Sequence, residues 1–519
     1  MESPAAYIPM DRRQAIARGE WLPDRARGAA LFVDISGFTP LTEALDNEHG
    51  PKRGAEELTR QLNLIYDALV TEVHRYGGSV LAFSGDAITC WFNGDDGFRA
   101  TGCGLSMQQA MGRFEAIKIS SGQTIPLAMK VAIAAGPVRR FQVGDPHVQF
   151  IDTLAGATLD RMAEAEHHAK KGEVVVTGDI IAKIKDRVEL AGWRYHPQTG
   201  EPYGLVAGLS AQAQSQAEVT PWPPLAPEAL REEQVRLWVL PPVFERLQLG
   251  QGEFLAELRP AVILFLYFSG IDYDGDERAG AKLDGYIRWV QAILARYDSY
   301  IFQLTIGDKG SYLYTAFGAP IAHEDDAVRA VSAALELQSR PSELDYIGEV
   351  KIGISQGQIY SGAYGGVTRR TYGVLGDEVN LAARLMQAAA AGQVLASDVV
   401  RYAAGDNFSW DDLPAIKVKG KAAPIKIFRP TGRRTERAIH LQEPVYTLPM
   451  VGRAAELEEV GAKLELVLAG RGQIVGITAE AGMGKSRLVA EIIRLARERH
   501  LVGYGGECQS FGTNISYLV

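Results

Sequence analysis

An internal repeat constrains the fold of this chain more than any other feature of its sequence. The segment LFVDISGF at residues 31–38 resembles LFLYFSGI at residues 264–271, and MKVAIAAGPV from Met129 resembles VKIGISQGQI from Val350. The two matches are offset by different numbers of positions, which indicates small insertions or deletions between two copies of one unit. We therefore expect two domains of the same fold.

The two copies differ at two positions where the first copy has an aspartate. Asp34 of the first copy aligns with Tyr267 of the second, and Asp86 aligns with Ser311. The first copy therefore keeps two carboxylates that the second copy lacks.

The local pattern around each aspartate predicts its structural setting. An apolar run from Ala30 to Val33 leads into DISGF and then into apolar positions at helical spacing, which predicts strand, turn and helix. Two further apolar runs, Ser79–Phe83 and Ala87–Phe92, are separated by three residues of turn composition, which predicts a β-hairpin. Asp86 should therefore lie at the tip of this hairpin.

The two aspartates form a candidate metal site. Asp34 and Asp86 could converge on two divalent ions and a triphosphate, an arrangement suited to in-line phosphoryl or nucleotidyl transfer. The backbone N–H groups of Gly37, Phe38 and Thr39 would lie at a helix N-terminus, where they favour phosphate oxygens. A capping role for Asp34 or a turn role for Asp86 would explain either residue alone.

The segments FVDISGFTPLTE and GGSVLAFSGDAITCWF resemble the first catalytic repeat of class III nucleotidyl cyclases, closest in layout to soluble adenylyl cyclase. The resemblance covers residues 25 to 430. It implies an α+β fold in which two ferredoxin-like domains form a pseudo-twofold intramolecular dimer. It also implies that Asp34, Ile35 and Asp86 hold two Mg²⁺ or Mn²⁺ ions. These ions activate the ribose 3′-hydroxyl for attack on the α-phosphate, and pyrophosphate leaves.

The second copy supplies the complement of that site. Its segment TYGVLGDEVNLAARLM is similar to the family helix whose Asn and Arg orient the ribose and stabilise transition-state charge, and Asn380 and Arg384 occupy those positions. Their i, i+4 spacing places both on one helix face, where an exposed pair with no function is the alternative. The first copy has only LAGATLDRMAEAE in this stretch, so the mirror site is expected to be inactive.

Three further positions bear on the substrate. By resemblance, Lys309 of IGDKGSYLYTAFG binds adenine, which favours ATP, and Lys130 contacts the β- and γ-phosphates. Gly373 stands where the family usually carries an Asp or Thr that also reaches the base, so the choice between ATP and GTP stays open. Soluble cyclases bind bicarbonate in the mirror site, but the expected lysine there is Ala82, although Arg161 could line that pocket.

The C-terminal segment predicts a second nucleotide site. The sequence QIVGITAEAGMGKS reads as a strand at Ile474–Thr478 and a phosphate-binding loop, followed by an amphipathic helix. Ala479 replaces the first glycine of the motif. The preceding MVGRAAELEEV resembles the entry to ATPase domains of signalling proteins, and the remaining ATPase and signalling domains of a longer chain are expected as partners. The residues expected to bind Mg-ATP are Gly482, Gly484, Lys485 and Ser486.

Composition excludes other classes. A net charge of −9 gives no reason to expect binding to nucleic acid or to an anionic membrane. The longest strongly apolar stretch, Ala261–Phe268, is far shorter than the ~20 residues of a transmembrane helix. Three cysteines without CxxC spacing indicate neither a disulfide scaffold nor a structural zinc, and fit a reducing cytoplasm.

Together these patterns predict an adenylyl cyclase that converts ATP to 3′,5′-cyclic AMP and pyrophosphate at one interdomain site, regulated by an ATPase module. The alternatives are a guanylyl cyclase with the same mechanism, or a non-catalytic nucleotide sensor that controls the P-loop domain. The predicted domains are a metal-binding half at 1–205, a linker at 206–250, a base and transition-state half at 251–430, a linker at 431–446 and a truncated P-loop domain at 447–519.

Overall fold

The computed structural model describes residues 3–119, 122–216, 221–251, 257–307, 310–418, 424–433, 450, 452–478 and 484–501. The chain divides into two compact units, Met1–Arg433 and Arg434–Val519. No helix in the described ranges is long and apolar enough to cross a membrane.

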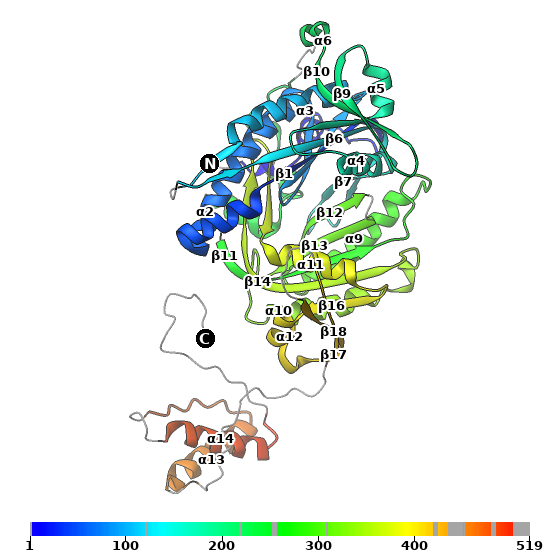
Figure 1. Cartoon of the computed structure of the whole chain (residues 1–519). Coiled ribbons are helices and arrows are strands. Elements are labelled where there is room, and N and C mark those ends of the chain that lie inside the picture. Colours follow the sequence, from blue (N-terminus) through cyan, green and yellow to red (C-terminus); the bar gives the residue numbers. More distant parts are fainter. Residues whose placement is uncertain are drawn as a thin grey trace. The chain divides into compact units, whose positions relative to one another are not determined.

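The first unit contains two sheets of the same topology (Figure 1), each with eight strands in the described ranges. The first has the order β2-β3-β1-β6-β8-β10-β9 with β7 beside β6, and the second has the order β12-β13-β11-β14-β16-β18-β17 with β15 beside β14. Strands β6 and β8, like β14 and β16, run parallel, and the other pairs are antiparallel. The predicted α+β fold with two similar domains is confirmed. We call β1–β10 with their helices repeat one, and β11–β18 with theirs repeat two.

The strands of repeat one are β1 (Arg25–Ser36), β2 (Ser79–Ser84), β3 (Ala87–Asn93), β6 (Ala128–Val143), β7 (Ile151–Ala155), β8 (Val174–Thr177), β9 (Val188–Tyr195) and β10 (Pro202–Leu209). A separate two-stranded ribbon consists of β4 (Ala116–Lys118) and β5 (Thr124–Pro126). The strands of repeat two are β11 (Glu257–Phe268), β12 (Ile301–Gly307), β13 (Gly310–Phe317), β14 (Val350–Gly365), β15 (Arg370–Leu375), β16 (Gln393–Ser397), β17 (Phe408–Ile416) and β18 (Ile425–Arg433).

The helices of repeat one are α2 (Phe38–Arg75), α3 (Phe98–Met111), α4 (Ala157–His167) and α5 (Gly178–Ile184). Those of repeat two are α9 (Ala279–Ala295), α10 (Asp326–Gln338), α11 (Asp377–Ala388) and α12 (Asp398–Ala404). The main connections therefore follow the same order in both repeats, which is what a duplicated unit requires.

Successive side chains of β1 point to opposite faces of the sheet. Leu31, Val33 and Ile35 are fully buried in the core under α2 and α3. Phe32 packs on the other face, with side chains of α4. Because side chains alternate along a strand, Asp34 belongs to the α4 face together with Phe32. The hydrophobic pattern thus fixes which way the first carboxylate points.

The strand register confirms the alignment of the two repeats. Asp34 faces Lys130 across β1 and β6, and Tyr267 faces Lys351 across β11 and β14. Asp34 and Tyr267 therefore occupy the same place in the two sheets. On the other side, Asp34 faces Ala87 and Tyr267 faces Tyr312, so that Asp86 and Ser311, one residue earlier, are also equivalent.

The segment predicted as the first linker, 206–250, carries regular structure. It contains the end of β10, α6 (Ala211–Gln216), α7 (Glu232–Arg236) and α8 (Pro241–Gln248). Trp238 and Leu240 are buried and pack with Tyr7 near the N-terminus and with Tyr372 of repeat two. Part of this segment therefore contributes to the core instead of only spanning two domains.

Helix α1 (Met10–Arg18) precedes repeat one and buries four consecutive polar residues, 11–14. Buried polar side chains need hydrogen-bond or ion-pair partners, and these four find theirs on other segments of the chain. Two partners lie in repeat one, one in repeat two and one in the segment before α7. The contacts run from Asp11 to Arg140, from Arg12 to Asp152 at 3.0 Å, from Arg13 to the Thr368 carbonyl at 2.5 Å and from Gln14 to the Pro223 carbonyl at 2.7 Å.

The second unit contains α13 (Ala454–Leu468) and α14 (Lys485–Glu498). The predicted strand at Ile474–Thr478 is wrong for this structure, since the segment has no regular structure and Ile474 is fully exposed. A strand needs a neighbour for its backbone groups, and no strand pairs with this segment among the described residues.

Candidate functional site

The two predicted metal carboxylates lie together. Asp34 is near the end of β1, and Asp86 is in the two-residue turn between β2 and β3, as the hairpin pattern predicted. The Ile35 backbone N–H donates a hydrogen bond of 3.1 Å to the Asp86 carbonyl, which ties the turn to β1. Burial, and then the charge of Asp34, raises the pKa of Asp86 to about 6. A cation between the two side chains would offset the charge of Asp34 that helps to raise the pKa of Asp86.

Lys130 extends this cluster. Its Nζ lies 3.3 Å from Asp34 Oδ2, and it also forms an ion pair with Glu166 at the end of α4. Burial lowers the pKa of Lys130, but the hydrogen bond to Glu166 and the charges of Glu166 and Asp34 outweigh it and raise the pKa overall. Lys130 is therefore a charged ammonium beside the carboxylates.

A cavity of about 870 Å³, the large cavity, opens between the two repeats. Asp86 lines it from repeat one, and Asn380 lines it from repeat two. The structure thus brings together the acidic turn and the helix that the sequence assigned to opposite halves of one site. Other residues that line the large cavity include Phe38, Thr42, Glu43, Ser84, Gly85, Phe265, Tyr267, Gln303, Tyr312, Tyr314, Lys351, Tyr360, Val374, Asp377 and Met386.

Helix α11 carries both predicted transition-state residues. Asn380 lines the large cavity, whereas Arg384 is half-buried one turn later and is not among the described residues that line it. Helices α4 and α11 each start directly after a glycine, Gly156 and Gly376, so that Asp160 stands in the place of Asn380. By the same count Glu164 stands in the place of Arg384, and repeat one therefore offers no equivalent pair.

The start of α2 borders the large cavity. Gly37 is the N-cap with φ 110°, and a Cβ there would lie 2.5 Å from the Pro126 carbonyl, so that only glycine fits. Phe38, the first helical residue, lines the cavity. The unpaired N–H groups at this helix N-terminus favour an anion such as phosphate. The Thr39 side chain lies outside the described part of the structure.

On the base side, the structure bears on Gly373 but not on Lys309. Lys309 lies outside the described residues, in the connection between β12 and β13. Gly373, on β15, does not line the large cavity among the described residues, whereas its neighbour Val374 does. A Cβ at Gly373 would lie 3.0 Å from the Tyr364 hydroxyl and 3.3 Å from the Tyr314 hydroxyl. Two tyrosines therefore occupy the space that a side chain at position 373 would need.

Sequence reasoning missed Lys351, which lines the large cavity. Its Nζ lies 3.3 Å from Glu349 Oε2 and 5.3 Å from the centre of the Tyr267 ring. The signal was present in the repeat itself, because Lys351 aligns with Lys130. The aromatic wall of Phe265 and Tyr314, whose rings stack at 5.1 Å, was also missed.

A second cavity of about 180 Å³ lies on the α4 side of the unit and is lined by Ala82, Glu166, Thr305 and Tyr312, among others. None of the described residues that line it is a lysine or an arginine. Arg161, the expected substitute for the missing lysine, instead contacts Asp179 and does not line this cavity.

In the second unit, α14 begins at Lys485, directly after Gly484 with φ 79°. This matches the predicted loop-to-helix transition at the GKS segment. Gly482 and the Ser486 side chain lie outside the described residues.

Asp34 and Asp86 fit a divalent cation that takes its remaining ligands from a nucleotide and from water. No group of three or more His, Cys, Asp or Glu side chains arranged for a metal occurs among the described residues. Asp34, Asp86 and the Ile35 carbonyl supply at most a partial oxygen shell. Mg²⁺ typically binds one or two carboxylates and completes its shell with substrate phosphates and water.

Two segments of the chain match known domain families. Residues 283–429 match the Adenylate and Guanylate cyclase catalytic domain family, and residues 449–519 match the AAA ATPase domain family. Adenylate cyclase type 10 of Rattus norvegicus is 24% identical over 95% of this chain and 32% of its own length. The Homo sapiens protein of the same name is 24% identical over 96% of this chain and 32% of its own length. The chain therefore spans about a third of these curated relatives.

A solved structure supports the fold. The crystal structure of a class III adenylyl cyclase-like ATP-binding protein from Pseudomonas aeruginosa covers 76% of this chain and 93% of its own, with a TM-score of 0.51 and 14% identity. At this identity the match concerns the fold alone. The chain thus carries a class III cyclase catalytic domain matched in repeat two, is similar to soluble adenylyl cyclase over most of its length, and continues into a segment that matches an AAA ATPase domain.

Proposed function

We propose that the first unit is an adenylyl cyclase with a single active site in the large cavity. The observation that supports this most directly is that Asp86 of repeat one and Asn380 of repeat two line the same cavity. Acidic and amide groups from opposite halves of the chain can then act on one nucleotide.

Groups complementary to a triphosphate lie in and beside this cavity: Phe38, Asp86 and Lys351 line it, whereas Asp34, Ile35 and Lys130 do not line it but belong to the cluster around Asp86. Asp34, Ile35 and Asp86 would hold two Mg²⁺ or Mn²⁺ ions, which lower the pKa of the ribose 3′-hydroxyl and neutralise charge on the phosphates when bound. The α2 N-terminus, Lys130 and Lys351 supply positive potential for phosphate oxygens.

The chemistry is an intramolecular displacement. The ribose 3′-oxygen forms a bond to the α-phosphorus, the bond from this phosphorus to the bridging oxygen breaks, pyrophosphate leaves, and the hydroxyl proton passes to solvent. Asn380 would orient the ribose. Arg384 would stabilise the charge that develops on the α-phosphate once its side chain turns toward the cavity, and such charge-matched donors are among the larger catalytic contributions.

The aromatic side chains of Phe265, Tyr312 and Tyr314 give the cavity a surface on which a purine can stack. Resemblance of the segment around Lys309 to soluble cyclases favours adenine. Regulation by the second unit is part of the proposal: Gly484, Lys485 and Ser486 would bind Mg-ATP, and a Lys485→Ala variant should lose nucleotide binding there while the first unit keeps its basal turnover.

The test is formation of cyclic AMP and pyrophosphate from ATP with Mg²⁺ or Mn²⁺. Asp34→Ala and Asn380→Ala should each abolish the product, whereas Asp160→Ala, the equivalent of Asn380 in repeat one, should keep it. Equal turnover by wild type and Asp34→Ala would reject the site.

Two outcomes would redirect the proposal. Preference for GTP over ATP in direct competition would make the protein a guanylyl cyclase. ATP binding without a cyclic product from either nucleotide would favour a nucleotide sensor, a reading that the description of the Pseudomonas aeruginosa protein as cyclase-like and ATP-binding makes worth testing.

A further inference from the structure

Each repeat contains a β-bulge at the same place in its first hairpin. The β2–β3 register shifts between Val80 and Ala82, and the β12–β13 register shifts between Ile301 and Gln303. These positions are equivalent in the two sheets. A bulge removes backbone groups from the ladder, so that they need partners from elsewhere.

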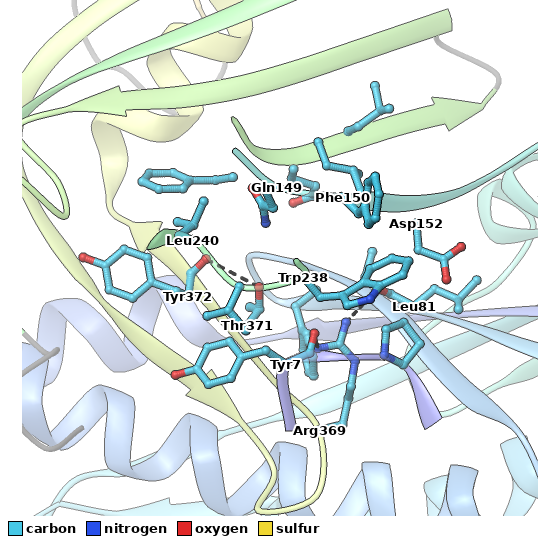
Figure 2. Close-up of a pocket in the computed structure, with 18 of the residues that line it drawn as sticks. Tyr7, Leu81, Gln149, Phe150, Asp152, Trp238, Leu240, Arg369, Thr371 and Tyr372 are labelled. Carbon is cyan, nitrogen blue, oxygen red and sulfur yellow. Dashed lines mark hydrogen bonds between the residues drawn. The ribbon is translucent and has the colours of Figure 1, made fainter. Parts of the chain in front are cut away.

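Two equivalent residues face these bulges from the opposite repeat. Gly144 directly follows β6 and Gly365 is the last residue of β14. A Cβ at Gly144 would lie 2.4 Å from the Gln149 carbonyl, and one at Gly365 would lie 2.6 Å from the Arg369 carbonyl. Gln149 and Arg369 therefore hold the same position in repeat one and repeat two. Both line a small cavity of about 100 Å³ between the repeats, and Figure 2 shows them there, contributed by different segments.

All three guanidinium nitrogens of Arg369 donate hydrogen bonds to backbone carbonyls. It donates to Val80 and Leu81 at 2.9 Å each, which are the carbonyls at the β2 bulge, and to Tyr7 at 3.0 Å. It is 5% exposed, and the Phe83 ring lies 5.4 Å below it. Burial, and then the charge of Arg13, lowers the pKa of Arg369 to about 9. Keeping a guanidinium buried among carbonyls is costly, which argues that these bonds serve a purpose.

Gln149 makes no such contact. Its Oε1 is buried and has no hydrogen-bond partner among the described residues, and its side chain forms no hydrogen bond with β12 in this part of the structure. The two hairpins are thus held differently, although their bulges match.

The β2–β3 hairpin, whose bulge Arg369 contacts, is also the hairpin that carries the carboxylate of Asp86. Asp86 lies at the tip of β2–β3, whereas the equivalent residue at the β12–β13 end is Ser311. Repeat two also contacts the β2–β3 hairpin nearer its tip, where the Gln303 side-chain amide donates to the Ser84 hydroxyl at 2.5 Å. We propose that Arg369 is a positioning residue for Asp86: it fixes, from repeat two, the hairpin that presents this carboxylate to the metal site. The inference rests on the metal-binding role in the proposed function.

The test compares Arg369→Met, Arg369→Lys and the matched control Gln149→Met in the full chain. Mn²⁺ affinity is measured by electron paramagnetic resonance with a non-cyclisable ATP analogue, beside binding of the analogue alone, turnover and melting temperature. Arg369→Met should weaken Mn²⁺ binding by at least about tenfold and lower kcat similarly, while metal-free analogue binding stays unchanged. Arg369→Lys should restore part of the affinity, and Gln149→Met should match wild type.

The outcomes separate a positioning role from a purely structural one. Wild-type Mn²⁺ affinity and turnover in Arg369→Met, even with a lower melting temperature, would overturn the inference. If Arg369→Met does not fold, the same comparison is made with Arg369→Lys, and unchanged Mn²⁺ affinity there overturns it. Mn²⁺ binding that depends on Asp86 and Arg369 without any cyclic product would uphold the positioning role and refute the cyclase. Binding insensitive to Asp86→Ala would refute both.

Discussion

Ile35 and Asp86 are joined through their backbones, with the Ile35 N–H donating to the Asp86 carbonyl at 3.1 Å. This bond ties the turn between β2 and β3 to the end of β1, a strand with a buried core face. The carboxylates of Asp34 and Asp86 consequently lie close together, with Asp34 partly buried and Asp86 accessible from the large cavity. Metal affinity and stability should therefore both depend on pH.

Divalent metal binding should weaken in acid. Burial and Asp34 raise the pKa of Asp86 to about 6, and a protonated carboxyl is a poor metal ligand. Mn²⁺ affinity should therefore fall about tenfold for each pH unit below about 6. Titration of Mn²⁺ binding across this range checks this, and an affinity independent of pH would contradict it.

Asp86→Asn should stabilise the metal-free protein at neutral pH. Because the folded-state pKa of Asp86 lies above 3.8, the folded protein binds more protons than the unfolded chain between about pH 4 and 6. Stability contributed by the neutral carboxyl is therefore lost as pH rises through this window. The variant should melt about 2 °C higher than wild type near pH 8 and show no gain near pH 4. Thermal unfolding with a chelator present measures this, and the opposite sign would show that Asp86 is stabilised as a carboxylate.

Arg384→Lys should lower kcat about a hundredfold and leave the KM for ATP nearly unchanged. A lysine keeps the charge but not the planar array of donors that an α-phosphate in the transition state requires. Steady-state kinetics measure the split. Glu164→Gln, at the equivalent place on α4, is the matched control and should turn over like wild type. A change in KM alone would assign Arg384 to ground-state binding.

Lys351→Met should raise the KM for ATP about tenfold at constant kcat, because Lys351 lines the large cavity from repeat two and its positive charge would be lost there. Lys282→Met provides a control, since Lys282 forms an ion pair with Asp276 on the surface and does not line this cavity. Unchanged kinetics in Lys351→Met would show that Glu349 and Tyr267 hold this lysine away from the substrate.

Gly373→Ala should destabilise the first unit by about 1 to 3 kcal/mol, because the added Cβ would meet the Tyr364 and Tyr314 hydroxyls. Tyr364→Phe in the same chain should recover part of the loss. Gly432→Ala, where a Cβ would meet nothing within 4 Å, should leave the denaturation midpoint unchanged. Equal midpoints for both alanine variants would mean that the tyrosines move aside freely.

The local parts of the site could be read from the sequence. A strand followed by DISGF and a three-residue gap between apolar runs were enough to predict the setting of Asp34 and Asp86, because those signals act over a few residues. The resemblance of TYGVLGDEVNLAARLM to a class III cyclase helix then indicated Asn380 as the complement of Asp86.

Contacts between segments far apart in the chain could not be predicted. From the sequence, Arg369 would be interpreted as one of two adjacent surface arginines. Only the structure shows that it contacts the β2 bulge. Tyr314 and Gly373 lie on different strands, and only the packed sheet shows that one fills the space beside the other. The strand predicted at Ile474–Thr478 was wrong because an apolar run alone does not supply the neighbour that a strand requires.

Helix α1 has a consequence for how the protein can be shortened. Its side chains at 11–14 bond to repeat one, to repeat two and to the segment before α7, so a chain that starts at β1 would leave the Arg140 guanidinium without one of its two carboxylates in the interior. A buried charge that loses a partner destabilises everything packed around it. The smallest fragment that folds as a working pair of repeats should therefore begin before Met10, although both sheets lie entirely after it.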